Sequence, residues 1–340
     1  MIERKASLGP LAVEQSLLAN DRLQDRYDLC LGVASWESRA TTAFKALPER
    51  DALWEVWSFA SDDAERAHAK SKCFSDLSSL RKERVDLIEL SGSLQYERNF
   101  EVIQSHLGAL RDAHSRPLDV LLDMTCMPKK YMLYFLGMAF RNEFVRTIDF
   151  VYSEGIYGAP NEREPAGALS WSGSEGEWSS VQVPYFEGDS FMPDSRGLVV
   201  SLGAEISASV PFIERYEPAL ISLVSVEDDP SRIDTSAIEK ERRLLHELSS
   251  LPITTSNVFQ LGDLLGVADS CRAFCRERPE MHVTGLAIGS KPHALALGLA
   301  ALSVHNFEIV CRLPSKYLLG DVAETGRIFL YRTSDRFEPR

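Results

Sequence analysis

The chain has 340 residues, enough for two ordinary domains or one large one, and each half is long enough to bury its own core. Its net charge of −13 and its pI near 5.1 argue against bulk binding of DNA, RNA or anionic lipid, so an anionic ligand requires a focused basic site. No apolar run reaches the length of about 18 residues that a membrane span needs, and the first residues show no secretion signal, so we expect a cytoplasmic protein.

Short apolar runs alternate with charged amphipathic segments along the first half of the chain. This rhythm predicts parallel strands that are connected by helices and buried on both faces of the sheet. The expected strands are 28–35, 52–60, 84–90, 117–125 and 147–155. The first half therefore predicts one Rossmann-like unit.

The second half repeats this rhythm. Its expected strands are 197–204, 219–226, 253–261, 281–289 and 307–314, with a late extra strand at 327–334. The first and third strands begin 56 residues apart in both halves (28 to 84 and 197 to 253), and the first and fourth begin 89 and 84 residues apart. We therefore predict an α/β fold with two Rossmann-like parallel-sheet units that form a pseudo-duplication. The expected domains are 1–155, 156–196 and 197–340.

The segment between the expected units, 156–196, is rich in Gly, Ser, Pro and acidic residues and lacks helical periodicity. It is either a linker or an inserted hairpin. Its fragment EWSSVQVPYF (177–186) alternates like a strand and is aromatic, which favours a small β insertion.

The cysteines are scattered and form no C-x-x-C pair with a matching partner, so no metal site is expected. Cys271 and Cys275 are four residues apart on an expected helix and could place two sulfur ligands on one face. Two ligands without a second pair rarely form a site, and reduced thiols are the default interpretation.

Two loops after expected strands share a small polar residue, a proline and a lysine at the start of an apolar helix. They lie at 123–130 (DMTCMPKK) and 289–292 (GSKP). In an open α/β sheet the ligand crevice lies beyond the carboxyl ends of the strands, and a helix start attracts anions. Lys291 in one loop, and Lys129 or Lys130 in the other, would add a positive charge for a phosphate.

Other side chains of these loops have two possible roles. The hydroxyls of Ser290 and Thr125 could donate hydrogen bonds to the same phosphate, and Asp123 could accept one from a ribose hydroxyl or a base. Alternatively, Ser290 or Thr125 only caps the helix that follows, while the lysines point into water. We expect the ligand in a crevice that the two units share.

The loops after the first strand of each half are the next candidates. The first carries Ser35, Glu37 and Arg39, which could contact a ligand, and Gly203 and Ser207 stand in their place in the second half. Neither loop has the G-x-G-x-x-G spacing of a dinucleotide site, which disfavours NAD or FAD, and no cofactor is expected. Each loop also suits a plain helix start.

The two-unit layout and the lysine loops resemble the CRISPR-associated Rossmann fold (CARF) domains and the related SAVED domains, which join two such units. These families often carry an Asp-x-Thr-x-Gly-Thr-Lys-type loop after the fourth strand. Asp123, Thr125 and Lys129 match part of it, whereas Met127 and Pro128 replace its Gly-Thr.

The second loop matches only the end of that motif, with Gly289, Ser290 and Lys291, and its strand lacks the aspartate. The resemblance implies a sensor of a cyclic or linear oligonucleotide second messenger in prokaryotic antiviral defence. Such a sensor would act through a protein partner or through self-assembly. The expected ligand-binding residues are Asp123, Thr125, Lys129, Lys130, Gly289, Ser290, Lys291, Ser35 and Gly203.

Catalysis has little support, because the sequence lacks a Walker loop, a G-x-S-x-G elbow, an H-E-x-x-H motif and a paired D-x-D or H-x-H cluster. His293 lies two residues after Lys291, which leaves a hydrolytic role near the crevice open. Two alternatives therefore stand beside the sensor: a nucleotide-processing enzyme of the hydrolase or nuclease type, and a ligand-free Rossmann-like adaptor in a protein complex.

Overall fold

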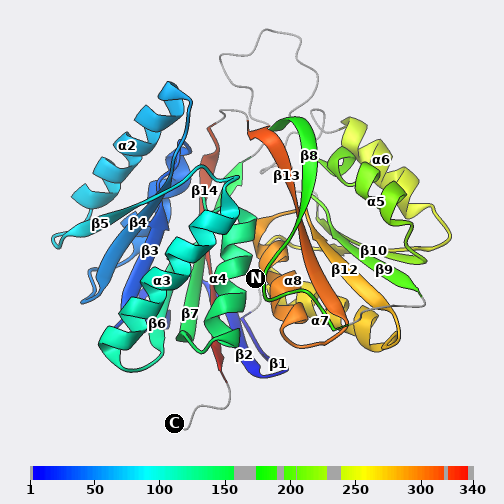
Figure 1. The fold of residues 1–340 in the computed structure, drawn as a ribbon, viewed down its shortest axis with the longest axis horizontal. Coiled ribbons are helices and arrows are strands. Elements are labelled where there is room, and N and C mark those ends of the chain that lie inside the picture. Colours follow the sequence, from blue (N-terminus) through cyan, green and yellow to red (C-terminus); the bar gives the residue numbers. More distant parts are fainter. Residues whose placement is uncertain are drawn as a thin grey trace. The chain divides into compact units, whose positions relative to one another are not determined.

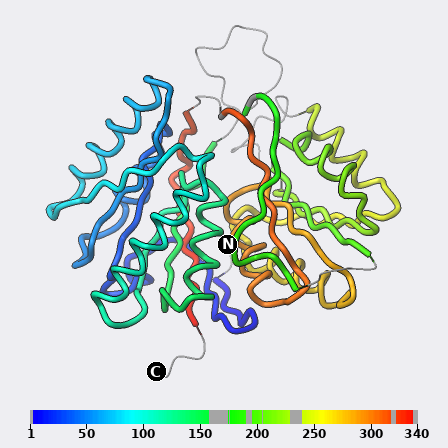
Figure 2. Tube along the Cα trace, viewed as in Figure 1, coloured from blue at the N-terminus to red at the C-terminus, as the bar shows by residue number. Residues whose placement is uncertain are grey.

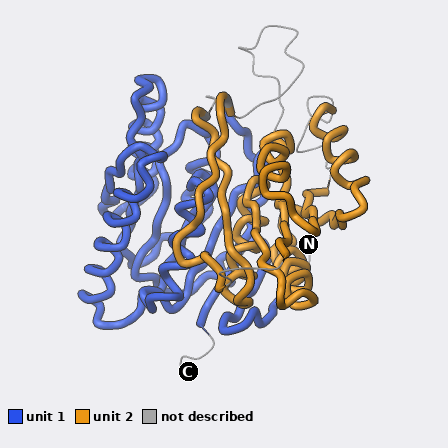
Figure 3. The backbone as a smooth tube through the Cα atoms, turned by 45° about the vertical axis from the view of Figure 1, so that its right-hand side comes forward, with its two compact units in different colours: residues 1–156, 319–340 blue, residues 157–318 orange. Residues whose placement is uncertain are grey.

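The computed structural model describes residues 3–156, 174–189, 195–203, 205–227, 239–317 and 321–335. The chain divides into two compact units (Figure 3): unit 1 comprises residues 1–156 and 319–340, and unit 2 comprises residues 157–318. Each unit is an α/β fold with its own sheet.

The sheet of unit 1 has eight strands in the order β1-β2-β14-β7-β6-β3-β4-β5 (Figure 1). The five strands from β7 to β5 are parallel, whereas β14, β2 and β1 add antiparallel pairs. The strands are β1 (Arg4–Leu8), β2 (Leu11–Leu17), β3 (Leu29–Val33), β4 (Leu53–Phe59), β5 (Val85–Leu90), β6 (Leu118–Asp123), β7 (Val145–Ile156) and β14 (Ala323–Asp335). All five strands expected in the first half are confirmed.

Helices connect the parallel strands of unit 1, and α3 packs against α4 on one face (Figure 1). The helices are η1 (Asn20–Arg22), η2 (Ser38–Thr41), α1 (Thr42–Ala46), α2 (Ala64–Ser79), α3 (Tyr96–His114) and α4 (Lys129–Arg141). Because helices cover both faces, the central strand β6 is buried on both sides: Val120, Leu121 and Leu122 are at most 1 % exposed.

A hairpin at the amino end, β1 with β2, is absent from the sequence-based expectations. Leu8 pairs with Leu11, so Gly9 and Pro10 form a two-residue turn. Gly9 has φ of 61°, which glycine adopts without strain, and Pro10 supplies the next, fixed negative φ. The Gly-Pro pair between two alternating segments was the signal for this hairpin.

The sheet of unit 2 has six strands in the order β11-β10-β9-β12-β13-β8. They are β8 (Ser174–Gln182), β9 (Arg196–Ser201), β10 (Leu220–Val226), β11 (Thr254–Phe259), β12 (His282–Ala287) and β13 (Phe307–Tyr317). The strands expected at 197–204, 219–226, 253–261, 281–289 and 307–314 are therefore confirmed. Leu198, Val199 and Val200 of β9 are 0 % exposed, as expected for a strand between two helical layers.

The helices of unit 2 are η3 (Ile206–Ala208), α5 (Val210–Tyr216), α6 (Glu239–Ser249), α7 (Leu264–Arg276) and α8 (Lys291–Ala301). One apolar cluster joins α5 and α6 to the face formed by alternate residues of β9, β10 and β12, and α7 packs against α8. Throughout the described ranges of the chain, no helix is both long and apolar enough to cross a bilayer.

The parallel cores of the two sheets have the same strand order. In chain order, each core places its strands as third, second, first, fourth and fifth: β5-β4-β3-β6-β7 in unit 1 and β11-β10-β9-β12-β13 in unit 2. An antiparallel strand then pairs with the fifth strand, β14 in one unit and β8 in the other. The pseudo-duplication itself stays a prediction, which this shared order favours.

The late strand differs from the expected division, because β14 joins the sheet of unit 1 rather than that of unit 2. It lies between β2 and β7 (Figure 2). Charge complementarity explains the pairing: Arg332 binds the fully buried Asp149 of β7 through two nitrogens at 2.6 and 2.7 Å, and Arg327 binds the fully buried Glu154 at 2.6 and 2.7 Å.

The segment expected as a linker or β insertion, 156–196, contributes a strand. Its β8 pairs antiparallel with β13 at the edge of the second sheet, so the β interpretation holds for 174–182. Residues 157–173 and 190–194 of this segment lie outside the described residues.

Candidate functional site

Each sheet has a topological switch point, where the strand order reverses. In unit 1 this point lies between β3 and β6, which are parallel neighbours, and in unit 2 it lies between β9 and β12. Loops at the carboxyl side of a switch point diverge to opposite faces of the sheet, which leaves a crevice for a ligand. Of the nine expected binding residues, Asp123 is the last residue of β6 and the other eight follow one of these four strands.

In unit 1, two of these residues hold the β6–α4 loop in place. The Asp123 carboxylate accepts a hydrogen bond from the Thr125 amide at 2.9 Å. The Thr125 hydroxyl oxygen accepts one from the amide of Ser153 in β7 at 2.9 Å. Thr125 therefore ties its loop to the neighbouring strand and does not cap α4, whose N-cap residue, Pro128, has no side-chain cap bond.

Ser35 and Asp123 both influence the pKa of Cys73 in α2. Burial raises the pKa of the Cys73 thiol, a hydrogen bond from the Ser35 backbone lowers it, and the negative charges of Asp76 and Asp123 raise it. The Ser35 hydroxyl oxygen accepts from the Glu37 amide at 3.3 Å. A residue of the loop after β3 and the last residue of β6 thus act on the same thiol. Such proximity is expected of neighbouring strands at a switch point.

The two lysines of this loop differ in their surroundings. Lys129 is half-buried and is the first residue of α4. Lys130 is 1 % exposed, and its ammonium lies 4.3 Å from the ring centroid of Tyr96 and 5.1 Å from that of Tyr131. Lys130 is almost completely enclosed whereas Lys129 is partly exposed, so Lys129 is the better placed of the two for a ligand.

The aromatic surroundings of Lys130 are fixed by a buried amide. Asn99 is fully buried, and its side chain bonds the backbone of Ser91 in both directions at 2.8 and 3.1 Å. It also donates to the Tyr131 hydroxyl at 2.8 Å, and that hydroxyl donates to the Ser93 carbonyl at 2.9 Å. Burial raises the pKa of Tyr131 to about 12, so this phenol stays protonated as a donor.

Glu37 and Arg39, both considered as ligand contacts, are engaged with the protein. Arg39 is 2 % exposed and donates to the Glu37 carboxylate at 2.6 Å and to the Ser153 carbonyl at 3.2 Å. This guanidinium joins the loop after β3 to β7.

Three residues beside the switch point were missed by the sequence reasoning. Trp36 follows Ser35 and is half-buried; the Arg66 guanidinium carbon lies 5.0 Å, and the Lys70 ammonium 5.7 Å, from its ring. Lys70 also donates to the Phe59 carbonyl at the end of β4 at 2.5 Å. Burial, together with the charge of Arg66, lowers the pKa of Lys70 to about 8. A tryptophan in the loop that follows a switch-point strand was the available signal.

In unit 2, the loops after β9 and β12 touch through glycines. The Gly289 amide donates to the Ser201 carbonyl at 2.6 Å, and a Cβ at Gly289 would lie 2.4 Å from the Ser201 hydroxyl oxygen and 2.6 Å from the Leu202 carbonyl oxygen. A Cβ at Gly203 would lie 3.2 Å from the Gly289 Cα. Only glycine therefore fits at position 289 without a shift of the backbone.

Ser290 and Lys291 begin α8. The Ser290 hydroxyl oxygen accepts from the His293 amide at 3.3 Å, so the capping interpretation is confirmed for this serine. Lys291 is half-buried at the first helical position. Ser207, from the other loop, donates to the Glu241 carboxylate at 2.8 Å.

The side chain of His293 belongs to the core. It is 0 % exposed, its Nε2 lies 3.3 Å from the Gln260 carbonyl, and its ring meets Phe259 edge-on. The hydrolytic role considered for this histidine therefore has no support from its position.

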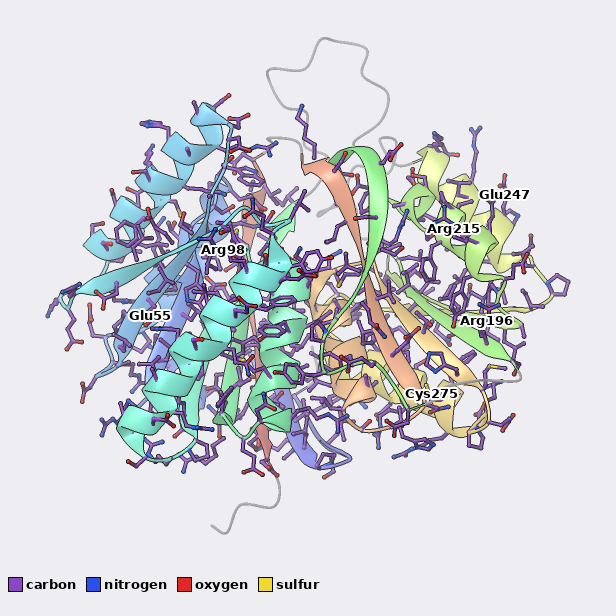
Figure 4. The ribbon with its side chains drawn as sticks, viewed as in Figure 1. Glu55, Arg98, Arg196, Arg215, Glu247 and Cys275 are labelled. Carbon is purple, nitrogen blue, oxygen red and sulfur yellow. The ribbon has the colours of Figure 1, made fainter. Side chains whose placement is uncertain are left out.

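A second polar cluster of unit 2 lies at the opposite, amino edge of the sheet. Glu308 accepts from the buried Thr284 hydroxyl and faces His282 at 3.2 Å, and Thr284 also bonds the Tyr216 hydroxyl at 2.7 Å. Arg196, labelled in Figure 4, stacks on Tyr216 at 5.2 Å. These bonds join β12, β13 and α5, which is a structural role.

The cysteine pair of α7, of which Cys275 is labelled in Figure 4, is buried, with Cys271 1 % and Cys275 0 % exposed. Burial raises the pKa of both thiols, to about 12 for Cys275, which disfavours the thiolate that a metal requires. Within the described part of the chain, no group of three potential metal-ligating residues comes together.

Comparisons with known proteins leave the family open. No protein-family profile matches the sequence, and no curated protein matches it. The cytoplasmic domain of a prokaryotic cation chloride cotransporter aligns with 86 % of this chain and 98 % of its own, at 8 % identity and a TM-score of 0.27. A keto acid-selecting NRPS module aligns with 87 % of this chain and 31 % of its own, at 10 % identity and a TM-score of 0.21. Scores this low support no shared fold or function.

Proposed function

We propose that this protein is a binding protein for a nucleotide or oligonucleotide second messenger, of the kind found in prokaryotic antiviral defence. Its ligand lies at the carboxyl edge of a sheet, beside a lysine loop, and its output passes through a protein partner or self-assembly. The resemblance to CARF and SAVED domains motivates the ligand class, and the CARF-like Asp123, Thr125 and Lys129 supply the motif.

One observation carries the proposal. The lysine loops follow the fourth strand of each parallel core, β6 and β12, at the two switch points, and each lysine opens a helix of more than ten residues. Lys129 and Lys291 therefore occupy equivalent positions in two sheets of equal strand order. A helix start and a flexible ammonium together favour a phosphate at each position.

Binding is favoured over turnover by the chemistry of these loops. Ser290 caps its helix, Thr125 bonds β7, and His293, the one residue considered for hydrolysis, lies in the core. A nucleotide-processing enzyme and a ligand-free adaptor are the competing functions, and each gives a different result in the following experiment.

The test is calorimetry with a panel of cyclic and linear oligonucleotides, at low and moderate salt. We expect Lys129→Ala or Lys291→Ala to weaken binding by about 1–3 kcal/mol, the scale of a charge-assisted hydrogen bond, without a change in folding. Lys72→Ala and Lys240→Ala, which remove exposed lysines of α2 and α6, are the matched controls and should bind as the wild type does.

Chromatography of the ligand after incubation separates the alternatives. An intact ligand supports the sensor, whereas a shortened or opened one supports the enzyme. If no nucleotide binds the wild type, or if both lysine variants bind as tightly as it does, the proposal fails and the adaptor takes its place.

A further inference from the structure

The loop after β3 places a large aromatic side chain at the switch point of unit 1. Trp36 directly follows Ser35, whose backbone bonds Cys73 of α2 and whose hydroxyl accepts from the Glu37 amide, so the base of the indole side chain is held by its neighbours. The indole is half-buried rather than enclosed in the core. An aromatic ring that is fixed at its base and partly exposed can accept a second flat ring.

Two cations from α2 lie over this indole. Arg66 and Lys70 are one helical turn apart and therefore on the same side of α2, 5.0 and 5.7 Å from the ring of Trp36. Asp63 caps α2 by accepting from the Arg66 amide at 3.0 Å, and Lys70 is held by the Phe59 carbonyl. The Lys70 ammonium and the first turn of α2, which carries Arg66, are thus held in place before any ligand arrives.

The burial of Lys70 is costly for folding alone. The residue is 9 % exposed, and its ammonium has exchanged water for one carbonyl and one ring. A surface cation–π contact is worth only about 0.5–1 kcal/mol and needs no buried charge. A charge that is partly dehydrated near the switch point interacts strongly with an anion that binds beside it.

We infer that Trp36, Arg66 and Lys70 form a nucleotide subsite, in which the indole stacks on a base and the two cations bind the adjoining phosphate. This inference rests on the proposed function and assigns the base-reading part of the site to unit 1. In unit 2 the loop after β9 has Gly203 against Gly289 instead of an aromatic residue, which suits a bare phosphate. The ligand of the unit 1 subsite is therefore an aromatic anion.

The test compares two probes: a linear adenylate trinucleotide with a 5′-hydroxyl end, and an abasic ribose-phosphate trimer of the same charge. We expect wild type to bind the adenylate trimer about tenfold more tightly, because stacking on an aromatic side chain is worth that much per base. Trp36→Leu should abolish the difference between the probes, and Trp36→Phe should retain most of it. Circular dichroism confirms the fold of each variant.

Lys70→Ala provides a second, independent measurement. It should weaken both trimers equally, by about tenfold, and lower the dependence of log affinity on log salt by about one phosphate contact. Lys72→Ala, on the exposed side of the same helix, is the control and should leave the slope unchanged.

The outcomes separate the two proposals. If both trimers bind the wild type equally and Trp36→Leu changes neither, the subsite is overturned while the proposed phosphate binding stands. If Lys70→Ala leaves the affinity and the salt slope of both trimers unchanged, the cation part of the subsite is overturned. If neither trimer nor any other nucleotide binds the wild type, the proposed function fails and the subsite fails with it.

Discussion

The loop after β6 in unit 1 and the loop after β12 in unit 2 occupy the same place in the strand order, yet their hydroxyl residues bond in different directions. Thr125 accepts from Ser153 of the neighbouring strand, whereas Ser290 accepts from His293 of its own helix. A hydroxyl in a strand-to-helix loop therefore serves either the sheet or the helix, and its presence alone does not indicate a ligand.

The lysines of the two loops are more alike than the hydroxyls. Lys129 and Lys291 are each the first residue of an apolar helix and each half-buried. The comparison teaches that the hydroxyls build the loops, and that the lysines are the groups to test for a ligand. The following changes either break this comparison or sharpen it.

The largest effect is expected at Gly289. The corresponding loop of unit 1, 124–128, has no glycine. Gly289→Ala places a Cβ against the Leu202 carbonyl, which is backbone and cannot rotate away. We expect a loss of about 2–3 kcal/mol in the free energy of unfolding, the upper range for overpacking, measured by urea denaturation. Gly203→Ala is the control and should cost less, because its Cβ would stay 3.2 Å from its nearest neighbour. Equal stability of the two variants would contradict the packing described for these loops.

The next effect concerns the bond from Thr125 to β7. Thr125→Val keeps the shape of the side chain but leaves the buried Ser153 amide without this acceptor. We expect a loss of about 2 kcal/mol in the free energy of unfolding, within the range for an unsatisfied buried group. Thr125→Ser keeps the oxygen and should lose much less. If valine and serine are equally tolerated, the hydroxyl is not what joins this loop to the sheet.

The strands were predictable from the sequence because their burial is a local property. Runs such as the one over 117–125 are mostly apolar, and in the structure β6 lies between two helical layers. The partner of a strand is not local. The run at 327–334 indicated a strand but not its sheet, which is decided by the pairing of Arg332 with Asp149 across 183 positions of sequence.

The candidate site was predictable to the level of loops, because strand order decides which loops lie at a switch point. The switch-point rule places Asp123 and Gly289 correctly from strand order alone. It does not predict that Lys130 turns toward aromatic rings, or that Lys70 reaches Trp36 from a helix 34 positions further along. Those contacts depend on how the helices lie on the sheet, which periodicity does not encode.

A smaller effect is expected at the helix cap of unit 2. Ser290→Ala removes the acceptor for the His293 amide, and the usual loss for an N-cap is about 1 kcal/mol in the free energy of unfolding. Ser290→Asp retains an acceptor and should recover most of the stability in the same thermal or urea measurement. A full loss in the aspartate variant would show that the cap is not the source of the effect.

The smallest expected effect is a dependence of the ligand affinity on pH, which arises from Lys70 in unit 1. Burial lowers the pKa of Lys70 to about 8, so its amine is charged in the free protein below that pH. A bound phosphate raises the pKa of the amine, so the affinity is constant below about pH 8 and falls as the pH rises toward the bound-state pKa. If that shift is about one unit, the affinity for the 5′-hydroxyl adenylate trimer falls about fourfold between pH 7.5 and 9.

The phosphodiesters of this probe do not titrate in that range, so the change reports on the protein. Lys70→Arg keeps its charge throughout and should make the profile nearly flat, while Lys72→Ala should keep the wild-type profile. A wild-type affinity that is constant to pH 9, or a Lys70→Arg profile as steep as that of the wild type, would place the titrating group elsewhere. The outcome decides whether the candidate site of unit 1 includes a buried cation, Lys70, in addition to Lys129 at its helix start.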